Sequence, residues 1–312
     1  MKAAVVTSFD APPRFEEFPL PQVQRGQRVV DVLAAAIHPL ARSLANGSHY
    51  SSGISPPLVP GLDGVGRGTD GKLRYFVLHD APVGSMAAQA VIDEDRSLVL
   101  PKDADPVLIA AAMNPAMGSW LALRRRVPFK KKQNVLVLGA TGSAGSMAVQ
   151  IAKRLGAGHV IAAGRAEALL KKLPALGATQ TVKLDDPRFG EICAEVDVVP
   201  DFIWGEPTAK AMTALITGRK DRGRLLTWVE IGSMAGLTAP IPAAALRAAQ
   251  FQIVGSGIGS VPGRDILKEL PSLVKELING EFEIDTKTVP LSDVTRAWSE
   301  AATSQQRIVL VP

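Results

Sequence analysis

The sequence of 312 residues contains little cysteine, tyrosine or histidine. Its single cysteine, Cys193, excludes an internal disulfide and any zinc site built from several thiolates. No two histidines have the i, i+4 spacing that holds a metal ion on a helix; they are His38, His49, His79 and His159. We therefore expect no bound metal.

Long apolar runs and a secretory leader are also lacking. No apolar run approaches the roughly 20 residues needed to span a bilayer. Residues 1–10 lack the basic stretch and apolar core of a signal peptide. Hydrophobic residues make up 46% and charged residues 21% of the chain, a balance that excludes a disordered protein and suffices for two domain cores. We expect a cytoplasmic protein that does not enter a membrane.

Positive charge exceeds negative charge, with a formal net charge of +5. The densest basic run comprises Arg124–Arg126 and Lys130–Lys132, and such a run can indicate a nucleic-acid partner. However, no nucleic-acid-binding motif accompanies it, and the apolar segment that follows is typical of a solvated turn before a buried strand. An anionic cofactor explains the charge balance equally well. We do not expect nucleic acid as a partner.

The first third of the chain predicts a small β-rich domain. Short β-type segments alternate with turn signals such as Asn46-Gly47 and Asp70-Gly71. Strands are expected at residues 3–7, 27–36, 74–78 and 88–92.

After residue 105, apolar runs alternate with longer helical patterns. Helices are expected at residues 106–114, 119–126, 143–155, 166–176, 208–216, 264–280 and 292–303. Strands are expected at residues 134–138, 159–163, 180–183, 196–202, 223–229, 252–255, 286–290 and 307–311. Between residues 134 and 255, this alternation predicts a parallel sheet with helices on both faces.

The strongest motif is VLVLGATGSAGSMAVQIAKRLGA, at Val135–Ala157. An apolar strand runs into Gly139, Gly142 and Gly145, and a helix begins directly behind them. Glycine lets the backbone turn tightly and approach a pyrophosphate, while the free amides at the helix N-terminus bind the anion. Strand, helix and next strand follow in the order of a Rossmann-type dinucleotide site. The alternative is a tight βα turn that binds no ligand.

The end of the next strand indicates which dinucleotide binds. An NAD site usually has Asp or Glu there to hold the ribose 2′-hydroxyl. This sequence instead reads AAGR at Ala162–Arg165. Gly164 leaves space, and the guanidinium of Arg165 suits a 2′-phosphate. We therefore predict NADPH as the cofactor; the alternative is that Arg165 is only a surface arginine.

With these motifs in place, the chain resembles the zinc-independent quinone oxidoreductases of the medium-chain dehydrogenase/reductase superfamily. The resemblance covers nearly the whole length, in MKAAVV, PLVPGLDGVGRG, AAMNPAMGSWLAL, the glycine turn and the final IVLVP. It implies an α/β fold in which a GroES-like β-rich catalytic domain is interrupted by a Rossmann NADPH-binding domain. The implied domains are residues 1–114 (catalytic), 115–256 (Rossmann) and 257–312, which return to the catalytic domain. A homodimer, formed through an exposed edge of the Rossmann sheet, is also implied.

The sequence departs from other members of the superfamily on the substrate side. Zinc-containing members carry an early ligand cysteine and a Gly-His-Glu motif, whereas the matching stretches here are AIHP at Ala36–Pro39 and GLD at Gly61–Asp63. A Gly-Asp-Arg-Val stretch that usually precedes the segment matching residues 84–92 is shortened. His38 replaces the usual asparagine. The cofactor is therefore better defined than the substrate.

The resemblance implies roles for individual residues. His38-Pro39 would lie beside the nicotinamide, and Tyr50 in the segment Gly47–Tyr50 would face the substrate. The segments 114–120, 231–233 and 255–257 would border the cofactor. The expected cofactor-binding residues are Asn114, Met117, Gly139, Thr141, Gly142, Ser143, Ala144, Gly145, Gly164, Arg165, Ile231, Gly232 and Ser256.

The implied activity is NADPH-dependent hydride transfer to a quinone or an α,β-unsaturated carbonyl. Tyr50 is the candidate to hydrogen-bond the substrate carbonyl and donate a proton; the alternative is a tyrosine packed at the end of a loop. His38 is expected either to polarise the carbonyl or contact the nicotinamide ribose, or to make only a structural hydrogen bond. A different class of function is a non-catalytic NADPH-binding redox sensor or a nucleic-acid-binding, crystallin-like protein, which would turn over no acceptor.

Overall fold

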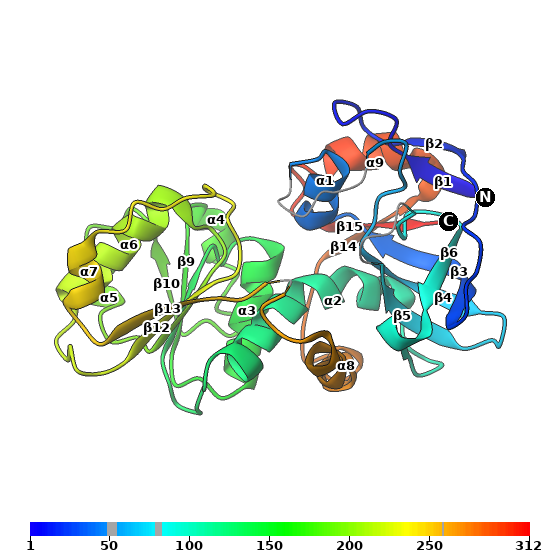
Figure 1. The fold of residues 1–312 in the computed structure, drawn as a ribbon. Coiled ribbons are helices and arrows are strands. Elements are labelled where there is room, and N and C mark those ends of the chain that lie inside the picture. Colours follow the sequence, from blue (N-terminus) through cyan, green and yellow to red (C-terminus); the bar gives the residue numbers. More distant parts are fainter. Residues whose placement is uncertain (49–54, 79–82, 258) are drawn as a thin grey trace. The chain divides into compact units, whose positions relative to one another are not determined.

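Figure 1 shows the computed structural model, which describes residues 1–48, 55–78, 83–257 and 259–312. The chain forms two compact units. The first unit contains Met1–Asn114, Leu270–Asn279 and Ile284–Pro312, and the second contains Pro115–Glu269 and Gly280–Glu283. The chain leaves the first unit within helix α2 (Pro106–Leu121) and re-enters it within helix α8 (Gly263–Ile278).

The first unit is built on a sheet that joins the two ends of the chain. Its described residues form seven strands in the order β14-β15-β3-β4-β5-β7, with β6 also paired to β3. The strands are β3 (Gln27–Ala36), β4 (Asp63–Gly68), β5 (Leu73–Val77), β6 (Gln89–Asp93), β7 (Ser97–Val99), β14 (Thr286–Pro290) and β15 (Arg307–Val311). Strand β15 pairs antiparallel with β3 and parallel with β14, so the C-terminal segment completes this sheet. A separate antiparallel pair joins β1 (Lys2–Val5) to β2 (Arg14–Glu17).

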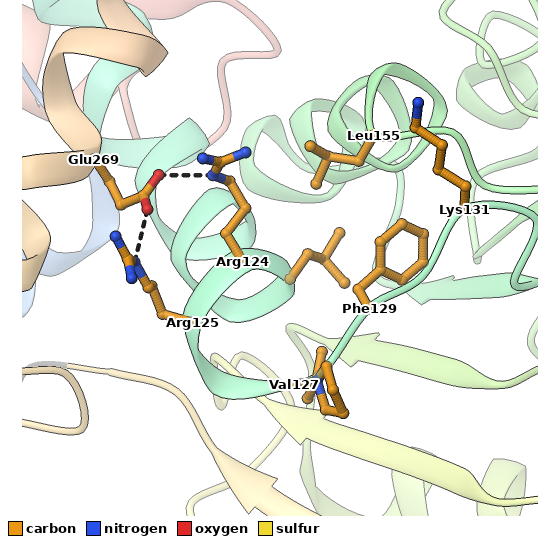
Figure 2. Close-up of a pocket in the computed structure, with 9 residues that line it drawn as sticks. Arg124, Arg125, Val127, Phe129, Lys131, Leu155 and Glu269 are labelled. Atoms are coloured by element: carbon orange, nitrogen blue, oxygen red, sulfur yellow. Dashed lines mark hydrogen bonds and ion pairs between the residues drawn. The ribbon is translucent and has the colours of Figure 1, made fainter.

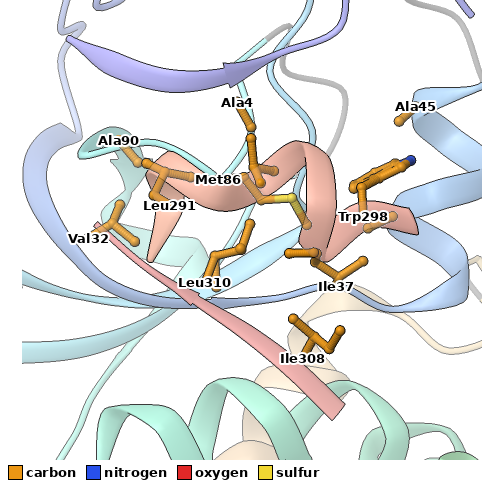
Figure 3. Close-up of a cluster of buried hydrophobic side chains, with 14 of the residues drawn as sticks. Ala4, Val32, Ile37, Ala45, Met86, Ala90, Leu291, Trp298, Ile308 and Leu310 are labelled. Carbon is orange, nitrogen blue, oxygen red and sulfur yellow. The ribbon is translucent and has the colours of Figure 1, made fainter. Parts of the chain in front are cut away.

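The main core of the first unit joins this sheet to two helices, α1 (Pro39–Ala45) and α9 (Val294–Glu300). In β3, Val30 and Val32 are buried and Asp31 between them is exposed, because successive side chains of a strand point to opposite faces. Figure 3 shows β3 and β15 side chains packed with Met86 and with Trp298 of α9. Two short 3₁₀ turns, η1 (Glu94–Arg96) and η3 (Leu291–Asp293), complete the unit.

Strand β4 was not predicted because three of its six residues are glycine, which disfavours a strand. The structure explains these glycines by close approach. A Cβ atom on Gly66 would lie 2.9 Å from the carbonyl oxygen of Asp31 in β3, and one on Gly64 would lie 3.0 Å from that of Ala34. Glycine thus lets β3 and β4 pack closely.

The second unit contains the predicted parallel sheet. Its described strands follow the order β10-β9-β8-β11-β12-β13, and every pair is parallel. They are β8 (Val135–Leu138), β9 (Val160–Gly164), β10 (Gln180–Lys183), β11 (Val198–Asp201), β12 (Leu226–Glu230) and β13 (Phe251–Gly255). The chain first builds outward from β8 to β10, then returns to add β11 on the other side of β8. This order, with its reversal between β8 and β11, confirms the predicted Rossmann-type arrangement.

The helices of the second unit differ in length from the prediction. They are α3 (Ser143–Arg154), α4 (Glu167–Leu170), α5 (Phe189–Ile192), α6 (Gly205–Gly218) and α7 (Ala243–Arg247). The helix expected at residues 166–176 is wrong beyond Leu170, where turns replace it. Pro174 disfavours a helical residue before it, and Gly177 adopts a left-handed φ of +111°.

Helix α2 continues into a π-helical turn, η2 (Ala122–Arg126), so one helix replaces the two expected segments. Among the described residues, Pro106–Arg126 is the one helix long and apolar enough to cross a membrane by length and composition. It is not an uninterrupted apolar run, since Asn114 and Ser119 lie within it and it ends in Arg124–Arg126. In addition, 67% of its most apolar window is buried within the protein, which is typical of a core helix in a water-soluble fold.

Candidate functional site

Three glycines, from the end of β8 to the first turn of α3, have three different surroundings. Gly139 adopts a left-handed φ of +81°, which makes the turn, and a Cβ there would lie 2.8 Å from the Ile203 side chain. A Cβ on Gly145 would lie 2.1 Å from the carbonyl oxygen of Gly139, so only glycine lets α3 pack on the turn. A Cβ on Gly142 would meet its nearest described neighbour at 3.7 Å, which leaves the front of the turn open.

The N-terminus of α3 is suited to bind an anion. Its N-cap is the exposed Gly142, and no side chain in the described residues caps the helix there. Residues Ser143–Ser146 contain no acid, whereas Lys153 and Arg154 lie in the last turn. The first amides of α3 therefore present unneutralised partial positive charge beside the open face of Gly142.

The neighbouring strand β9 ends at Gly164. A Cβ on Gly164 would lie 2.6 Å from the methyl carbon of Thr141, so the space left by this glycine is filled by Thr141 and is not open as the sequence suggested. Arg165 is exposed, with no hydrogen bond or ion pair to any described residue. Lys171, by contrast, is paired with Glu167 at 3.0 Å. Arg165 is thus the available cation at this strand end.

Strand β11, on the other side of β8, ends in a carboxylate that sequence reasoning missed. Asp201 is fully buried. One carboxylate oxygen accepts the backbone amides of Ile203 and Trp204 at 2.9 and 3.1 Å. The other accepts Thr208 Oγ1 at 2.7 Å and Trp228 Nε1 at 2.8 Å. Its sequence signal is a single Asp at the end of a wholly apolar strand.

Asp201 also fixes the segment that follows β12. Its backbone carbonyl accepts the amides of Ile231 and Gly232 at 2.8 and 3.1 Å. A Cβ on Gly232 would lie 3.2 Å from the carbonyl oxygen of Phe202, and one on Gly118 of α2 would lie 3.3 Å from the Ile231 side chain. The ends of β11 and β12 are therefore held together by one buried residue.

Beyond the β11 end, the backbone is strained. Trp204 has a φ of +51°, although it is not glycine, and Gly205 follows at +73°. Such a conformation in a bulky residue persists only where its surroundings hold it, and here the Asp201 carboxylate accepts the Trp204 amide. Trp204 itself is half-buried and packs against the core of this unit.

Beyond β13, the amide of Ser256 donates to the carbonyl of Glu230 at 2.8 Å. Burial, and then the nearby charge of Asp201, raises the pKa of the Glu230 carboxyl. Ser256 is itself buried.

The second unit therefore brings most of the predicted cofactor residues to one edge of its sheet. The residues at the carboxyl ends of β8, β9, β12 and β13 are Gly139, Thr141, Gly142, Ser143, Ala144, Gly145, Gly164, Arg165, Ile231, Gly232 and Ser256. Ligands of such sheets bind outside the strand ends where the strand order reverses, here between β8 and β11. Met117 lies half-buried on α2 in the same unit, and Asn114 is the last residue of the first unit's opening segment.

In the first unit, both ring nitrogens of His38 are engaged. Nδ1 accepts the Ala41 amide at 3.2 Å, which caps α1, so the neutral ring carries its proton on Nε2. Nε2 then donates to Asp63 at 3.0 Å, and the Tyr75 hydroxyl donates to the other Asp63 oxygen at 2.7 Å. All three side chains are buried. This arrangement leaves neither nitrogen of His38 for a substrate, which favours the structural alternative.

The buried Asp63 affects its neighbours. The pKa of Tyr75 is raised well above its ordinary value, mainly by burial and then by the charge and hydrogen bond of Asp63. Arg307 of β15 is buried nearby in the same unit and donates to the carbonyl of Ile37 at 3.1 Å. Burial lowers its pKa to about 10, against the opposing effect of Asp63.

Tyr50, the expected proton donor, and His49 lie outside the described residues. Among the residues that are described, no group of three or more His, Cys, Asp or Glu side chains could hold a metal ion. Cys193 is buried, and burial followed by the charge of Asp186 raises the pKa of its thiol to about 12. It therefore has no thiolate to offer at neutral pH.

Comparison with known proteins agrees with this geometry. The chain is 28% identical to "Probable NADPH-dependent quinone reductase tdiC" of Emericella nidulans, with 100% of both chains covered. It is 25% identical to 2-methylene-furan-3-one reductase of Solanum lycopersicum, over 62% of this chain and 54% of that protein. No family profile matches the chain.

A solved structure confirms the fold. The quinone oxidoreductase of Thermus thermophilus, which has also been solved in complex with NADPH, superposes with a TM-score of 0.81. The two chains cover each other fully at 23% identity. The predicted resemblance is confirmed: in fold, and in sequence along its whole length, the chain resembles the zinc-independent quinone oxidoreductases of the medium-chain dehydrogenase/reductase superfamily.

Proposed function

We propose that this protein is an NADPH-dependent oxidoreductase that transfers hydride to a quinone or an α,β-unsaturated carbonyl. The observation that carries the proposal is the β8–α3 turn. Gly142 leaves its front open before an uncapped helix N-terminus, at the reversal of a parallel sheet. The whole-length similarity to an NADPH-dependent quinone reductase supports the same activity.

The second unit fits a dinucleotide phosphate. The first amides of α3 bind the pyrophosphate, and the backbone at Gly142 allows its close approach. The guanidinium of Arg165 binds the ribose 2′-phosphate, which NADH lacks. Backbone groups at Ile231-Gly232 and Ser256 orient the nicotinamide end. When bound, NADPH supplies the hydride.

The first unit provides the substrate side in this proposal. Tyr50 donates a hydrogen bond to the substrate carbonyl and a proton to the reduced product. His38 has a positioning role: it caps α1, and this helix precedes the segment that contains Tyr50. Residues 1–114 and 257–312 form the catalytic domain and residues 115–256 form the NADPH-binding domain.

We further propose a cytoplasmic homodimer. Strand β13 lies at an edge of the second unit's sheet, where unpaired backbone groups can add a strand from a second copy. In the segment between β12 and α7, Met234 and Leu237 expose 74% and 83% of their surface, and exposed large apolar side chains are common at interfaces.

A cofactor-oxidation assay tests the function. NADPH and NADH would each be offered with a benzoquinone, a naphthoquinone, a linear enone and an aldehyde. We expect turnover of quinones or the enone with NADPH, and much slower turnover with NADH. Tight NADPH binding without turnover of any acceptor would contradict the proposal and favour the redox-sensor alternative. Loss of the proton-transfer step, but not of NADPH binding, in Tyr50→Phe would support the role of Tyr50.

A further inference from the structure

A cavity of the second unit lies away from the glycine turn. It has a volume of about 500 Å³ and is lined by Leu123, Arg124, Arg125, Val127, Pro128, Phe129, Lys131, Leu155 and Glu269. Figure 2 shows these side chains around the segment between η2 and β8. Residues 127–131 precede β8 and Leu155 is the C-cap of α3, whereas the glycine turn follows the last residue of β8. The two sites therefore lie at opposite ends of β8.

A buried carboxylate orients two arginines at this cavity. Glu269 is 3% exposed and accepts hydrogen bonds from Arg124 Nε at 2.6 Å and Trp120 Nε1 at 3.0 Å. It also forms an ion pair with Arg125, whose Nε lies 2.6 Å from the other carboxylate oxygen. The Arg124 guanidinium also lies over the Trp120 ring, 4.8 Å from its centroid. Burial alone would raise the pKa of Glu269, but the hydrogen bonds and charges of these partners hold it below its ordinary value.

The arrangement leaves donors unused. Each guanidinium contacts Glu269 through Nε, and no hydrogen bond joins the Nη atoms of Arg124 or Arg125 to a described residue. Both side chains are 40% exposed, so those donors are accessible. An arginine held by one edge and open at the other is preorganised to bind an anion in bidentate fashion.

Lys131 adds a third positive charge. Its aliphatic stem packs on Gly156, where a Cβ would lie 3.1 Å from Lys131 Cγ. The next residue, Lys132, adopts a left-handed φ of +71°, and its amide donates to the Gly156 carbonyl at 2.7 Å. This turn sets the position of Lys131. With one carboxylate, already paired, against three cations, the cavity lining is positive.

The rest of the lining is apolar. Phe129 and Leu155 are half-buried, and Leu123 and Val127 are buried behind them. Figure 2 shows the Phe129 ring near Leu155 and Lys131, with Arg124 and Arg125 on the opposite side of the view. Apolar surface with a few convergent charges is the usual make-up of a small-molecule site.

We propose that this cavity binds an amphipathic organic anion, in which a carboxylate, sulfonate or phosphate group is attached to an aromatic or short aliphatic body. The charged group contacts the Nη edges of Arg124 and Arg125 and the Lys131 ammonium, and the apolar body packs on Phe129 and Leu155. This site is separate from the dinucleotide site and does not depend on the proposed activity.

A titration with 8-anilinonaphthalene-1-sulfonate, followed by its fluorescence, tests this proposal. Saturating NADP⁺ is present throughout so that the dinucleotide site is closed to the probe. Lys131→Gln is expected to weaken binding about five- to tenfold, as the loss of a charge-assisted contact. The matched control is Lys130→Gln, which removes the same charge one residue away from the cavity lining and should leave the affinity unchanged.

Phe129→Ala distinguishes binding in a site with an apolar wall from binding to a basic surface by charge alone. The variant keeps every charge and is expected to bind the probe severalfold more weakly. Its melting temperature and circular dichroism spectrum verify that it is folded. Absence of saturable binding to the wild-type protein would overturn the proposal. So would equal weakening by Lys130→Gln and Lys131→Gln with no effect of Phe129→Ala, because a surface that binds polyanions, including nucleic acid, gives that result.

Discussion

At the scale of single residues, two glycines of the β8–α3 turn differ in what a methyl group would meet. A Cβ on Gly145 would overlap the Gly139 carbonyl at 2.1 Å, whereas one on Gly142 would touch its nearest described neighbour at 3.7 Å. Gly145→Ala should therefore destabilise the fold, by about 2 kcal/mol or more. Gly142→Ala should leave the melting temperature nearly unchanged and weaken NADPH binding about tenfold or more.

Thermal unfolding and a fluorescence titration of NADPH check this pair. If Gly142→Ala bound NADPH as tightly as the wild-type protein, the assignment of the open face to the pyrophosphate would be wrong. The two variants carry the same chemical change three residues apart, so each is the control for the other.

Arg165 carries the second prediction at this scale. It is exposed, with no described partner, at the end of β9. Arg165→Ala should weaken NADPH binding about tenfold or more, because a charge-assisted contact with the 2′-phosphate is lost. The affinity for NADH should be nearly unchanged. Lys171→Ala is the control, since Lys171 is paired with Glu167. The measurement is the dissociation constant of each variant for NADPH and for NADH. An equal loss of affinity for both cofactors in Arg165→Ala would contradict the assignment of Arg165 to the 2′-phosphate.

At the scale of elements, Asp201 connects β11, β12 and α6. The two carboxylate oxygens of Asp201 accept four hydrogen bonds. In Asp201→Asn one oxygen is replaced by an NH₂ group, which faces two of the N–H or O–H donors and cannot accept from them. We expect the variant to lose about 2–4 kcal/mol of unfolding free energy, because buried donors lose their acceptors. Urea unfolding measures this.

The matched control for this prediction is Asp185→Asn, whose side chain is 79% exposed and which should unfold as the wild-type protein does. Equal stabilities of the two variants would show that the Asp201 contacts are replaced by water.

The sequence pattern predicted elements well wherever local chemistry determines them. Strands β3, β10, β14 and β15 have the predicted bounds, since their apolar runs or alternation stop at turn residues. Strand β4 could not be predicted, because its glycines serve the packing of β3, which lies elsewhere in the chain. Asp201 was missed for the same reason: Thr208 and Trp228, which define its role, are separate from it in sequence. The glycine turn was found because its three roles follow from adjacent residues.

At the scale of the whole molecule, alkaline stability should depend on Cys193. Burial raises the pKa of this thiol to about 12, so the folded protein keeps a proton that the unfolded chain loses above pH 9. Stability is therefore full below pH 9 and falls as the pH rises toward 12, by about 1.4 kcal/mol per pH unit for this group. Tyr75, whose pKa is also raised, acts in the same direction at higher pH.

Cys193→Ala removes this dependence. Urea unfolding between pH 8 and pH 11 should give a shallower decline for the variant than for the wild-type protein, with parallel curves below pH 8. The same decline in both proteins would mean that the thiol is not what responds to pH.

The pairing of β15 with β3 sets an order of folding during synthesis. The Arg307 side chain and the Ile37 carbonyl that it contacts are 270 residues apart in sequence. Residues 115–269 of the second unit are contiguous, and can fold as soon as they leave the ribosome. The first unit is made first but cannot close its sheet until residues 307–311 emerge. At a synthesis rate of about 5–20 residues per second, roughly ten seconds or more pass between the synthesis of β3 and that of β15. During this time β3 lacks its pairing with β15. A chain cut short before β15 would leave this edge of β3 permanently open to aggregation.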